Sequence, residues 1–109
     1  MNNKSEILEH LYSIISSRKD SDPEASYTAH LFAKGTPEIA RKLGEEAVET
    51  ITAALVEEDK SIIRESADLL YHLLVLWAEK GIVPSEVWDE LTRREGTSGI
   101  DEKAGRHQN

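Results

Sequence analysis

The sequence contains no cysteine, and this absence excludes several kinds of chemistry at once. A chain without cysteine forms no disulfide, carries no thiolate nucleophile and offers no thiolate ligand to zinc. The lack of disulfides is typical of proteins in reducing compartments, so we expect a cytoplasmic protein. The opening residues MNNKSEILEH also lack the long apolar segment of a secretory signal peptide.

Long hydrophobic runs and an excess of basic residues are missing as well. The richest apolar stretch, ADLLYHLLVLWA, is shorter than the roughly 18 to 20 residues of a membrane span and is interrupted by His72. It is typical of a buried helix. The 13 basic residues are outnumbered by 21 acidic ones, which gives a net charge of −8. We therefore expect no membrane or nucleic-acid partner, and a polyanionic substrate would need cations to bind.

What the chain does contain is helical periodicity. Hydrophobic residues make up 39% of the 109 positions, enough for one core, and no alternating strand pattern is present. We expect an all-α domain over residues 1–96, an antiparallel bundle of about four to five helices. The expected helices cover residues 5–18, a segment from 22 or 23 to 34, and residues 37–56, 60–80 and 84–95. For the polar tail, residues 97–109, we expect an extended or mobile segment; closure over a substrate is the alternative.

Local signals predict where several of these helices begin and end. Asp22 followed by Pro23 favours the start of the second helix. Gly35 and Gly81 are natural helix stops, and the Thr36 hydroxyl is expected to cap the third helix. Short connections then make the third and fourth helices antiparallel neighbours.

Apolar surface also predicts the assembly. The stripe on the first helix and the apolar fourth helix present more hydrophobic surface than one small subunit readily covers. We expect a homodimer that completes the helical bundle.

Acidic residues cluster in two short stretches, KLGEEAVE and ESADLLYH. A helix turns 100° per residue, so Glu45, Glu46 and Glu49 share one face of the third helix. Glu65 and Asp68 repeat the three-residue spacing on the fourth helix. If the two helices pack antiparallel, the two groups lie at comparable heights, and four or five carboxylates converge across one seam.

Such a group of acids would repel itself unless a cation bridges it. Oxygen ligands in this number suit Mg²⁺, with Mn²⁺ as the alternative, and leave coordination positions for substrate phosphates. A solvated helix face is the simpler explanation of either stretch alone. A di-iron site is disfavoured, because none of the four histidines follows a glutamate at the three-residue spacing.

Three segments of the chain resemble a known family. SYTAHLFAKGTPEIARKLGEEAVETITAAL (residues 26–55), ESADLLYHLLVL (65–76) and REGTSGIDEKAGR (94–106) are similar to the phosphoribosyl-ATP pyrophosphatases of histidine biosynthesis. This family lies within the MazG-like all-α nucleoside triphosphate pyrophosphatases. The resemblance implies Mg²⁺-dependent hydrolysis of phosphoribosyl-ATP to phosphoribosyl-AMP and pyrophosphate, by a stand-alone version without the cyclohydrolase domain to which many relatives are fused.

The resemblance also implies roles for the acids. Glu46, Glu49, Glu65 and Asp68 match the metal ligands, and Glu45 completes the group as an outer ligand or as the residue that orients the attacking water. Anhydride hydrolysis needs no side-chain nucleophile, so we predict direct attack by water with Glu49 or Glu45 as general base.

Basic and aromatic residues supply further candidates. Lys34 and Lys42 are expected to bind the polyphosphate, although both could simply be surface charges. Weaker candidates of the same kind are Arg18, Lys19 and Arg64. His72 follows Asp68 by four residues and could hydrogen-bond its carboxylate, or lie in an interface. Packing or capping roles are expected for Tyr27, His30 and Tyr71. For Trp77 and Trp88 we expect core or dimer contacts rather than base stacking.

Two other functions stay open at this point. A housecleaning pyrophosphatase that removes unwanted nucleotides would use the same metal site and differ only in its substrate. A non-enzymatic helical dimerisation module would carry the acids merely as surface charge.

Overall fold

The computed structural model describes residues 4–56 and 58–96, and within these ranges it contains helices and no strand. The elements are η1 (Lys4–Glu6), α1 (Ile7–Ser17), α2 (Tyr27–Lys34), α3 (Thr36–Val56), α4 (Asp59–Lys80) and α5 (Pro84–Arg94). The all-α prediction is confirmed. The predicted tail, residues 97–109, lies outside the described residues.

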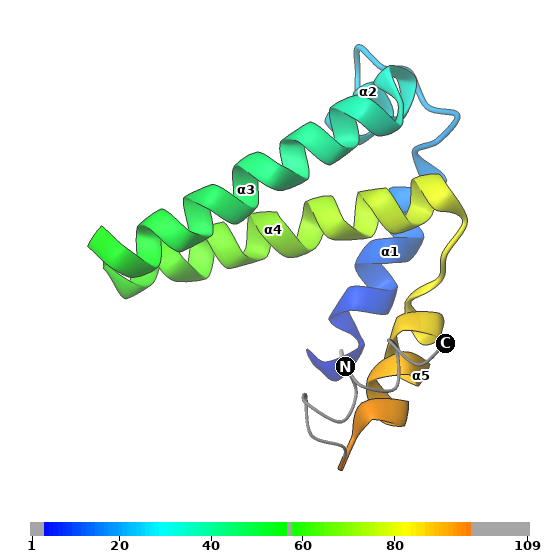
Figure 1. Cartoon of the computed structure of the whole chain (residues 1–109). Coiled ribbons are helices and arrows are strands. Elements are labelled where there is room, and N and C mark those ends of the chain that lie inside the picture. Colours follow the sequence, from blue (N-terminus) through cyan, green and yellow to red (C-terminus); the bar gives the residue numbers. More distant parts are fainter. Residues whose placement is uncertain (1–3, 57, 97–109) are drawn as a thin grey trace.

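The two longest helices, α3 and α4, pack along each other and run antiparallel (Figure 1). The end of α3 and the start of α4 extend as an arm, while α1, α2 and α5 gather around the other end of the pair (Figure 1). The predicted antiparallel arrangement of the two long helices is therefore confirmed. It places the acidic stretches of α3 and α4 opposite each other.

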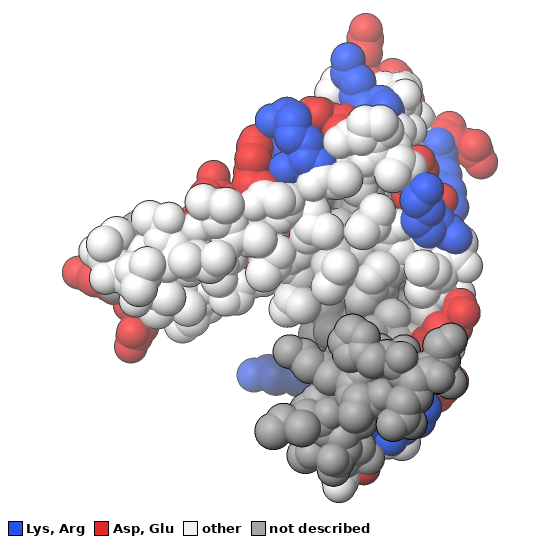
Figure 2. All heavy atoms as spheres, viewed as in Figure 1, with Lys and Arg blue, Asp and Glu red and all other residues white. Residues whose placement is uncertain are grey.

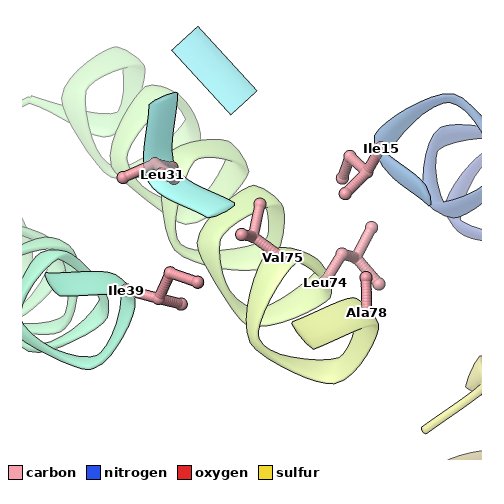
Figure 3. Packing of buried hydrophobic residues seen from close by; sticks show 6 residues of the cluster. All are labelled: Ile15, Leu31, Ile39, Leu74, Val75 and Ala78. Carbon is pink, nitrogen blue, oxygen red and sulfur yellow. The ribbon is translucent and has the colours of Figure 1, made fainter. Parts of the chain in front are cut away.

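The hydrophobic core lies where four helices meet at the inner end of the arm. Ile15 of α1, Leu31 of α2 and Ile39 of α3 pack with residues of α4 and are almost completely buried (Figure 3). The α4 members of this core are Leu74, Val75 and Ala78. The apolar stretch of α4 is helical and is buried or half-buried from His72 to Ala78, as predicted, but Leu70 in its first half is 43% exposed. No helix in the described part of the chain combines the length and apolar character needed to cross a membrane.

Aromatic side chains fix α5 and α1 to the end of α4. The rings of Trp77 and Trp88 meet edge to face with centroids 5.9 Å apart, and the Trp88 indole donates to Glu9 Oε1 at 2.6 Å. The Tyr12 hydroxyl donates to the carbonyl of Ile82 at 2.7 Å. The packing role expected for the two tryptophans is met within a single chain.

Two predicted helix starts are wrong. The second helix begins at Tyr27, because the Ser26 hydroxyl accepts the amide of Ala29 at 3.1 Å and so caps it. Asp22 does accept the amide of Glu24 at 2.9 Å, as a helix cap would. Only a single turn over residues 23–25 follows it, however, and the helix itself begins after Ser26.

The third helix also differs at its start. Its first i to i+4 bond runs from the Ile39 amide to the Gly35 carbonyl, so Thr36 lies inside the helix. The Thr36 hydroxyl donates to Glu79 Oε2 at 3.0 Å rather than capping the helix. This bond fixes the start of α3 to the end of α4. Gly35 and Gly81 do end helices with positive φ, as predicted.

One face of the arm is apolar and uncovered within the chain. Val48, Ile51 and Leu55 of α3 lie on one stripe and are each more than half exposed. Ile63 and Leu70, which share one stripe of α4, are exposed as well. Figure 2 shows the arm as a largely uncharged surface, with charged side chains gathered at its edges. These five residues are called the arm face below.

Candidate metal centre

Three glutamates converge between α3 and α4. Carboxylate oxygens of Glu46, Glu49 and Glu65 all lie within 4.8 Å of one another, a spacing at which one metal ion can be bound. Glu46 and Glu49 are one turn apart on α3, and Glu65 reaches them from α4 because the two helices run antiparallel. The geometry thus joins the two acidic stretches of the sequence. These residues are called the acid group below.

The acid group includes carboxylate oxygens that lack any hydrogen-bond partner. Glu46 is only 8% exposed, and its Oε2 atom is buried and unpaired. Oε2 of Glu65 is likewise buried without a partner. Unpaired buried carboxylate oxygens are unfavourable, so native proteins usually satisfy them with donors or cations. The acid group therefore has the donor set and the unsatisfied charge that fit a hard divalent cation.

The pKa values of the acid group also show that its negative charges are unfavourable. Burial raises the pKa of Glu46, and hydrogen bonding and repulsion from Glu49 raise it further. Hydrogen bonding with Glu49 is the main cause that raises the pKa of Glu65, followed by burial. Two carboxyl groups can share a hydrogen bond only if one holds a proton. Without a cation, the acid group therefore favours proton uptake.

Asp68 and Glu45 lie differently with respect to the acid group. Asp68 is exposed on α4, and its charge contributes to the raised pKa values of Glu46 and Glu65, which places it at the edge of the group. Its carboxylate is not among the oxygens within 4.8 Å of one another. Glu45 instead pairs with Arg41 Nη1 at 2.7 Å and with Lys42 Nζ at 3.5 Å.

Lys42 is the predicted cation that contacts the acidic stretch of α3, because its Nζ atom lies 3.5 Å from Glu45. Tyr27, followed by Glu45, raises the pKa of Lys42, and Glu46 adds to this effect. Lys34 is exposed at the end of α2, where its charge contributes to the lowered pKa of Glu38, whose main cause is the hydrogen bond from Arg41. Of the two lysines, Lys42 is therefore the better candidate for a role beside the acid group.

The weaker cationic candidates have other contacts. Lys19 Nζ lies 5.7 Å from the centroid of the Phe32 ring, and Arg64 Nη2 donates to Ser61 Oγ at 3.4 Å. Arg18 is exposed beyond the end of α1. Within residues 4–56 and 58–96, no hydrogen bond or ion pair connects these three residues to the acid group.

Sequence reasoning overlooked Arg41. Its guanidinium donates twice to Glu38, at 2.8 Å each, and once to Glu45 at 2.7 Å. The signal was present, because acids three residues before and four residues after an arginine lie on its face of the helix. Arg41 explains why Glu45 turns away from the acid group.

His72 has a different partner from the one expected. It is 5% exposed, and its Nδ1 atom donates to the main-chain carbonyl of Asp68 at 2.9 Å rather than to the carboxylate. The Tyr27 hydroxyl approaches Nε2 of the same ring at 3.3 Å. His72 is therefore buried between α2 and α4 within the chain. Beside it, the hydroxyls of Thr28 and Tyr71 are hydrogen-bonded to each other.

Two antiparallel helices with carboxylates converging between them define an all-α protein whose acid group has a spacing suited to a divalent cation. The chain belongs to the phosphoribosyl-ATP pyrophosphohydrolase family, whose sequence model matches residues 8–95. It is 63% identical over 102 residues to the phosphoribosyl-ATP pyrophosphatase of Paramagnetospirillum magneticum, which covers 94% of each chain. It is 56% identical to that of Rhodospirillum rubrum (93% of this chain, 86% of the relative) and 55% identical to that of Azospirillum brasilense (92% and 90%). The family implies a divalent metal cofactor, which the acid group fits.

Proposed function

We propose that this chain hydrolyses phosphoribosyl-ATP to phosphoribosyl-AMP and pyrophosphate, the second step of histidine biosynthesis. The single observation that carries the proposal is the acid group, with two buried oxygens that have no partner, in a chain that belongs to this family. A cation site of this kind suits a substrate with a triphosphate, which a chain of net charge −8 would otherwise repel.

The cofactor we propose is Mg²⁺, with Mn²⁺ as a substitute. Glu46, Glu49 and Glu65 would hold the ion, and Asp68 would complete the site from its edge. When bound, the ion supplies charge neutralisation for phosphoryl oxygens and lowers the pKa of water. Glu45 is assigned to Arg41 and Lys42, which it holds beside the acid group, rather than to direct ligation.

The chain's own residues bind the substrate and move the proton. Lys42 contacts the polyphosphate beside the acid group, and Lys34 contributes from the end of α2. Glu49 is the exposed member of the acid group and accepts a proton from the attacking water. The water oxygen forms the new bond to phosphorus, the α–β anhydride bond breaks, and pyrophosphate leaves.

The assembly we propose is a homodimer that buries the arm face. Five large apolar side chains of the arm are exposed, and exposed apolar surface of this kind often marks a protein–protein interface. Since the arm is formed by α3 and α4, pairing two arms would complete a four-helix arrangement. We assign the reaction to the cytoplasm, in keeping with the cysteine-free sequence.

A pyrophosphate-release assay tests the proposed reaction. Phosphoribosyl-ATP is compared with ATP, dCTP and dUTP in the presence of Mg²⁺, and we expect turnover of phosphoribosyl-ATP to dominate. The variant Glu49→Gln should lose at least about a hundredfold in kcat, the lower range for removal of a general base. Glu58→Gln, an exposed glutamate that precedes α4, is the matched control and should retain activity.

Equal or better turnover of the plain nucleotides would instead indicate a housecleaning pyrophosphatase. If no nucleotide is hydrolysed and Mg²⁺ does not bind, the non-enzymatic dimerisation module remains. Full activity of Glu49→Gln would exclude Glu49 as the base.

A further inference from the structure

Tyr27, the first residue of α2, combines an exposed ring with a fixed hydroxyl. The residue is 50% exposed, and it is the only phenylalanine, tyrosine or tryptophan among the exposed large side chains of residues 4–56 and 58–96. Its hydroxyl nevertheless lies 3.3 Å from Nε2 of the buried His72. An exposed aromatic ring whose polar end is held in the interior is not free to change its orientation.

The direction of this hydrogen bond follows from the other nitrogen of the histidine. Nδ1 of His72 lies 2.9 Å from the carbonyl oxygen of Asp68. A carbonyl oxygen only accepts, so Nδ1 carries the proton, and in the neutral ring Nε2 must accept from the Tyr27 hydroxyl. The chain of bonds Tyr27–His72–Asp68 therefore connects the start of α2 to the helix that supplies Glu65 and Asp68 to the site.

Neighbouring rings support Tyr27 from behind. The Tyr71 ring is stacked on it, with centroids 6.5 Å apart and an interplanar angle of 23°. The His72 ring approaches edge-on, with centroids 6.1 Å apart. Tyr71 is itself held by the hydroxyl of Thr28. A planar ligand that stacks on the outer face of Tyr27 would meet a preorganised surface and lose little side-chain entropy from the protein.

This aromatic surface lies beside the groups that we assign to the phosphates. The ammonium of Lys42 lies 3.5 Å from a carboxylate oxygen of Glu45, next to Glu46 in the sequence, and Tyr27 is the first cause of the raised pKa of Lys42. Through His72, Tyr27 is connected by hydrogen bonds to the turn of α4 that carries Asp68. The hydrogen bonds thus connect the exposed aromatic ring to the edge of the acid group.

We propose that the exposed ring of Tyr27 stacks on the adenine base of the substrate, and that His72 is the positioning residue that holds this ring in place. The proposal rests on the proposed function, since a nucleotide must have its phosphates at the acid group and Lys42. Stacking of a base on an aromatic side chain typically contributes a tenfold or larger effect on binding. The ring would act on substrate affinity rather than on the chemical step.

Steady-state kinetics with phosphoribosyl-ATP separate these effects. We expect Tyr27→Leu to raise KM about tenfold or more with kcat nearly unchanged, and Tyr27→Phe, which keeps the ring, to raise it only a few-fold. His72→Leu should raise KM as the tyrosine variants do, while His72→Gln, which keeps an acceptor for the Tyr27 hydroxyl, should recover part of the loss. Because the two residues act as a unit, the double variant Tyr27→Leu/His72→Leu should be no worse than the poorer single variant.

Two controls distinguish stacking from a structural role. Mn²⁺ affinity, measured by calorimetry, should be the same in parent and Tyr27→Leu, and so should the oligomeric mass from sedimentation. His10→Ala, which removes an exposed ring from α1, should leave KM unchanged.

Several results would overturn the inference while leaving the proposed function intact. They are an unchanged KM in Tyr27→Leu, a fall in kcat without a rise in KM, and a shift in oligomeric mass that would assign the ring to a subunit interface. If the parent does not hydrolyse phosphoribosyl-ATP, the proposed function fails instead. Binding of ATP with Mn²⁺ then tests the ring directly: weaker binding to Tyr27→Leu supports stacking, and equal binding overturns it.

Discussion

Replacement of Glu46 by glutamine should separate the destabilising effect of the acid group on the fold from its role in metal binding. Glu46 is 8% exposed, its Oε2 atom has no partner, and Glu49 and Asp68 add repulsion. An amide of the same shape removes the negative charge and adds a donor that can reach the neighbouring carboxylates. Relief of an unsatisfied buried group is worth about 1–3 kcal/mol, so the metal-free Glu46→Gln protein should be more stable than the metal-free parent by an amount in this range.

The assay is thermal unfolding with EDTA and with Mg²⁺ or Mn²⁺, at one fixed protein concentration. For a domain of about 100 residues, each 1 kcal/mol shifts Tm by roughly 4–8 °C, so the gain in EDTA is measurable. For the parent, a cation at one thousand times its Kd should add about 4.1 kcal/mol, and Glu46→Gln should lose most of this increment. The two proteins should therefore exchange their order of stability when metal is added.

The pH dependence of stability in the metal-free parent independently tests whether the Glu46 carboxylate destabilises the fold. Burial raises the pKa of Glu46 in the folded state above its ordinary value of 4.5. At pH values between 4.5 and this raised pKa, the folded state therefore binds more protons than the unfolded state. Stability should consequently fall as the pH rises through this window, and Glu46→Gln should flatten the fall. Raised pH should cost the parent less when Mg²⁺ is present.

The reasoning would be refuted if Glu46→Gln were less stable than the parent in EDTA while it retained the full shift with Mg²⁺. That result would mean that the carboxylate stabilises the fold without any cation. Glu58→Gln is the control, because an exposed glutamate outside the acid group should change neither the stability in EDTA nor the metal shift.

Two further predictions concern the assembly and the core. Ile51→Glu places a charge on the arm face, where Ile51 is 59% exposed, and should convert a dimeric parent to monomers in sedimentation; an unchanged mass would show that the arm face is not the interface. Leu74→Ala should lower the free energy of unfolding by about 2–5 kcal/mol in urea denaturation, because Leu74 is 1% exposed in the core. Leu91→Ala, at a residue that is 55% exposed, should stay within about 0.5 kcal/mol of the parent, and a comparable loss there would contradict the burial argument.

The parts of the structure that the sequence predicted are those set by repeated local signals. The two long helices follow from many apolar positions at helical spacing and from Gly81, which adopts the left-handed conformation that a helix stop requires. Once these helices are antiparallel, the meeting of Glu46, Glu49 and Glu65 follows from spacing alone. The convergence of these three glutamates could therefore be predicted without knowledge of any individual side-chain contact.

The features that escaped prediction depend on competition between neighbours. Asp22 and Ser26 each accept a nearby amide as a helix cap does, but only the residues after Ser26 continue as a helix. Glu45 has the same helical spacing as a ligand, but Arg41 offers it an ion pair on its own face of α3. Periodicity places a residue on a face of a helix and does not choose among the partners available there.

A comparison of Glu45 with Glu46 shows how a candidate metal site differs from a charged helix surface. Both Glu45 and Glu46 lie in one acidic run, yet Glu45 is paired with two cations of its own helix, whereas Glu46 Oε2 is buried with none. A solvated helix face would satisfy its acids in the first way, through exposed pairs worth little to stability. The second arrangement destabilises the chain by itself, so a bound cation or an added proton would stabilise it. The buried unpaired oxygens, more than the number of acids, are therefore the observation that favours a cation site over surface charge in this protein.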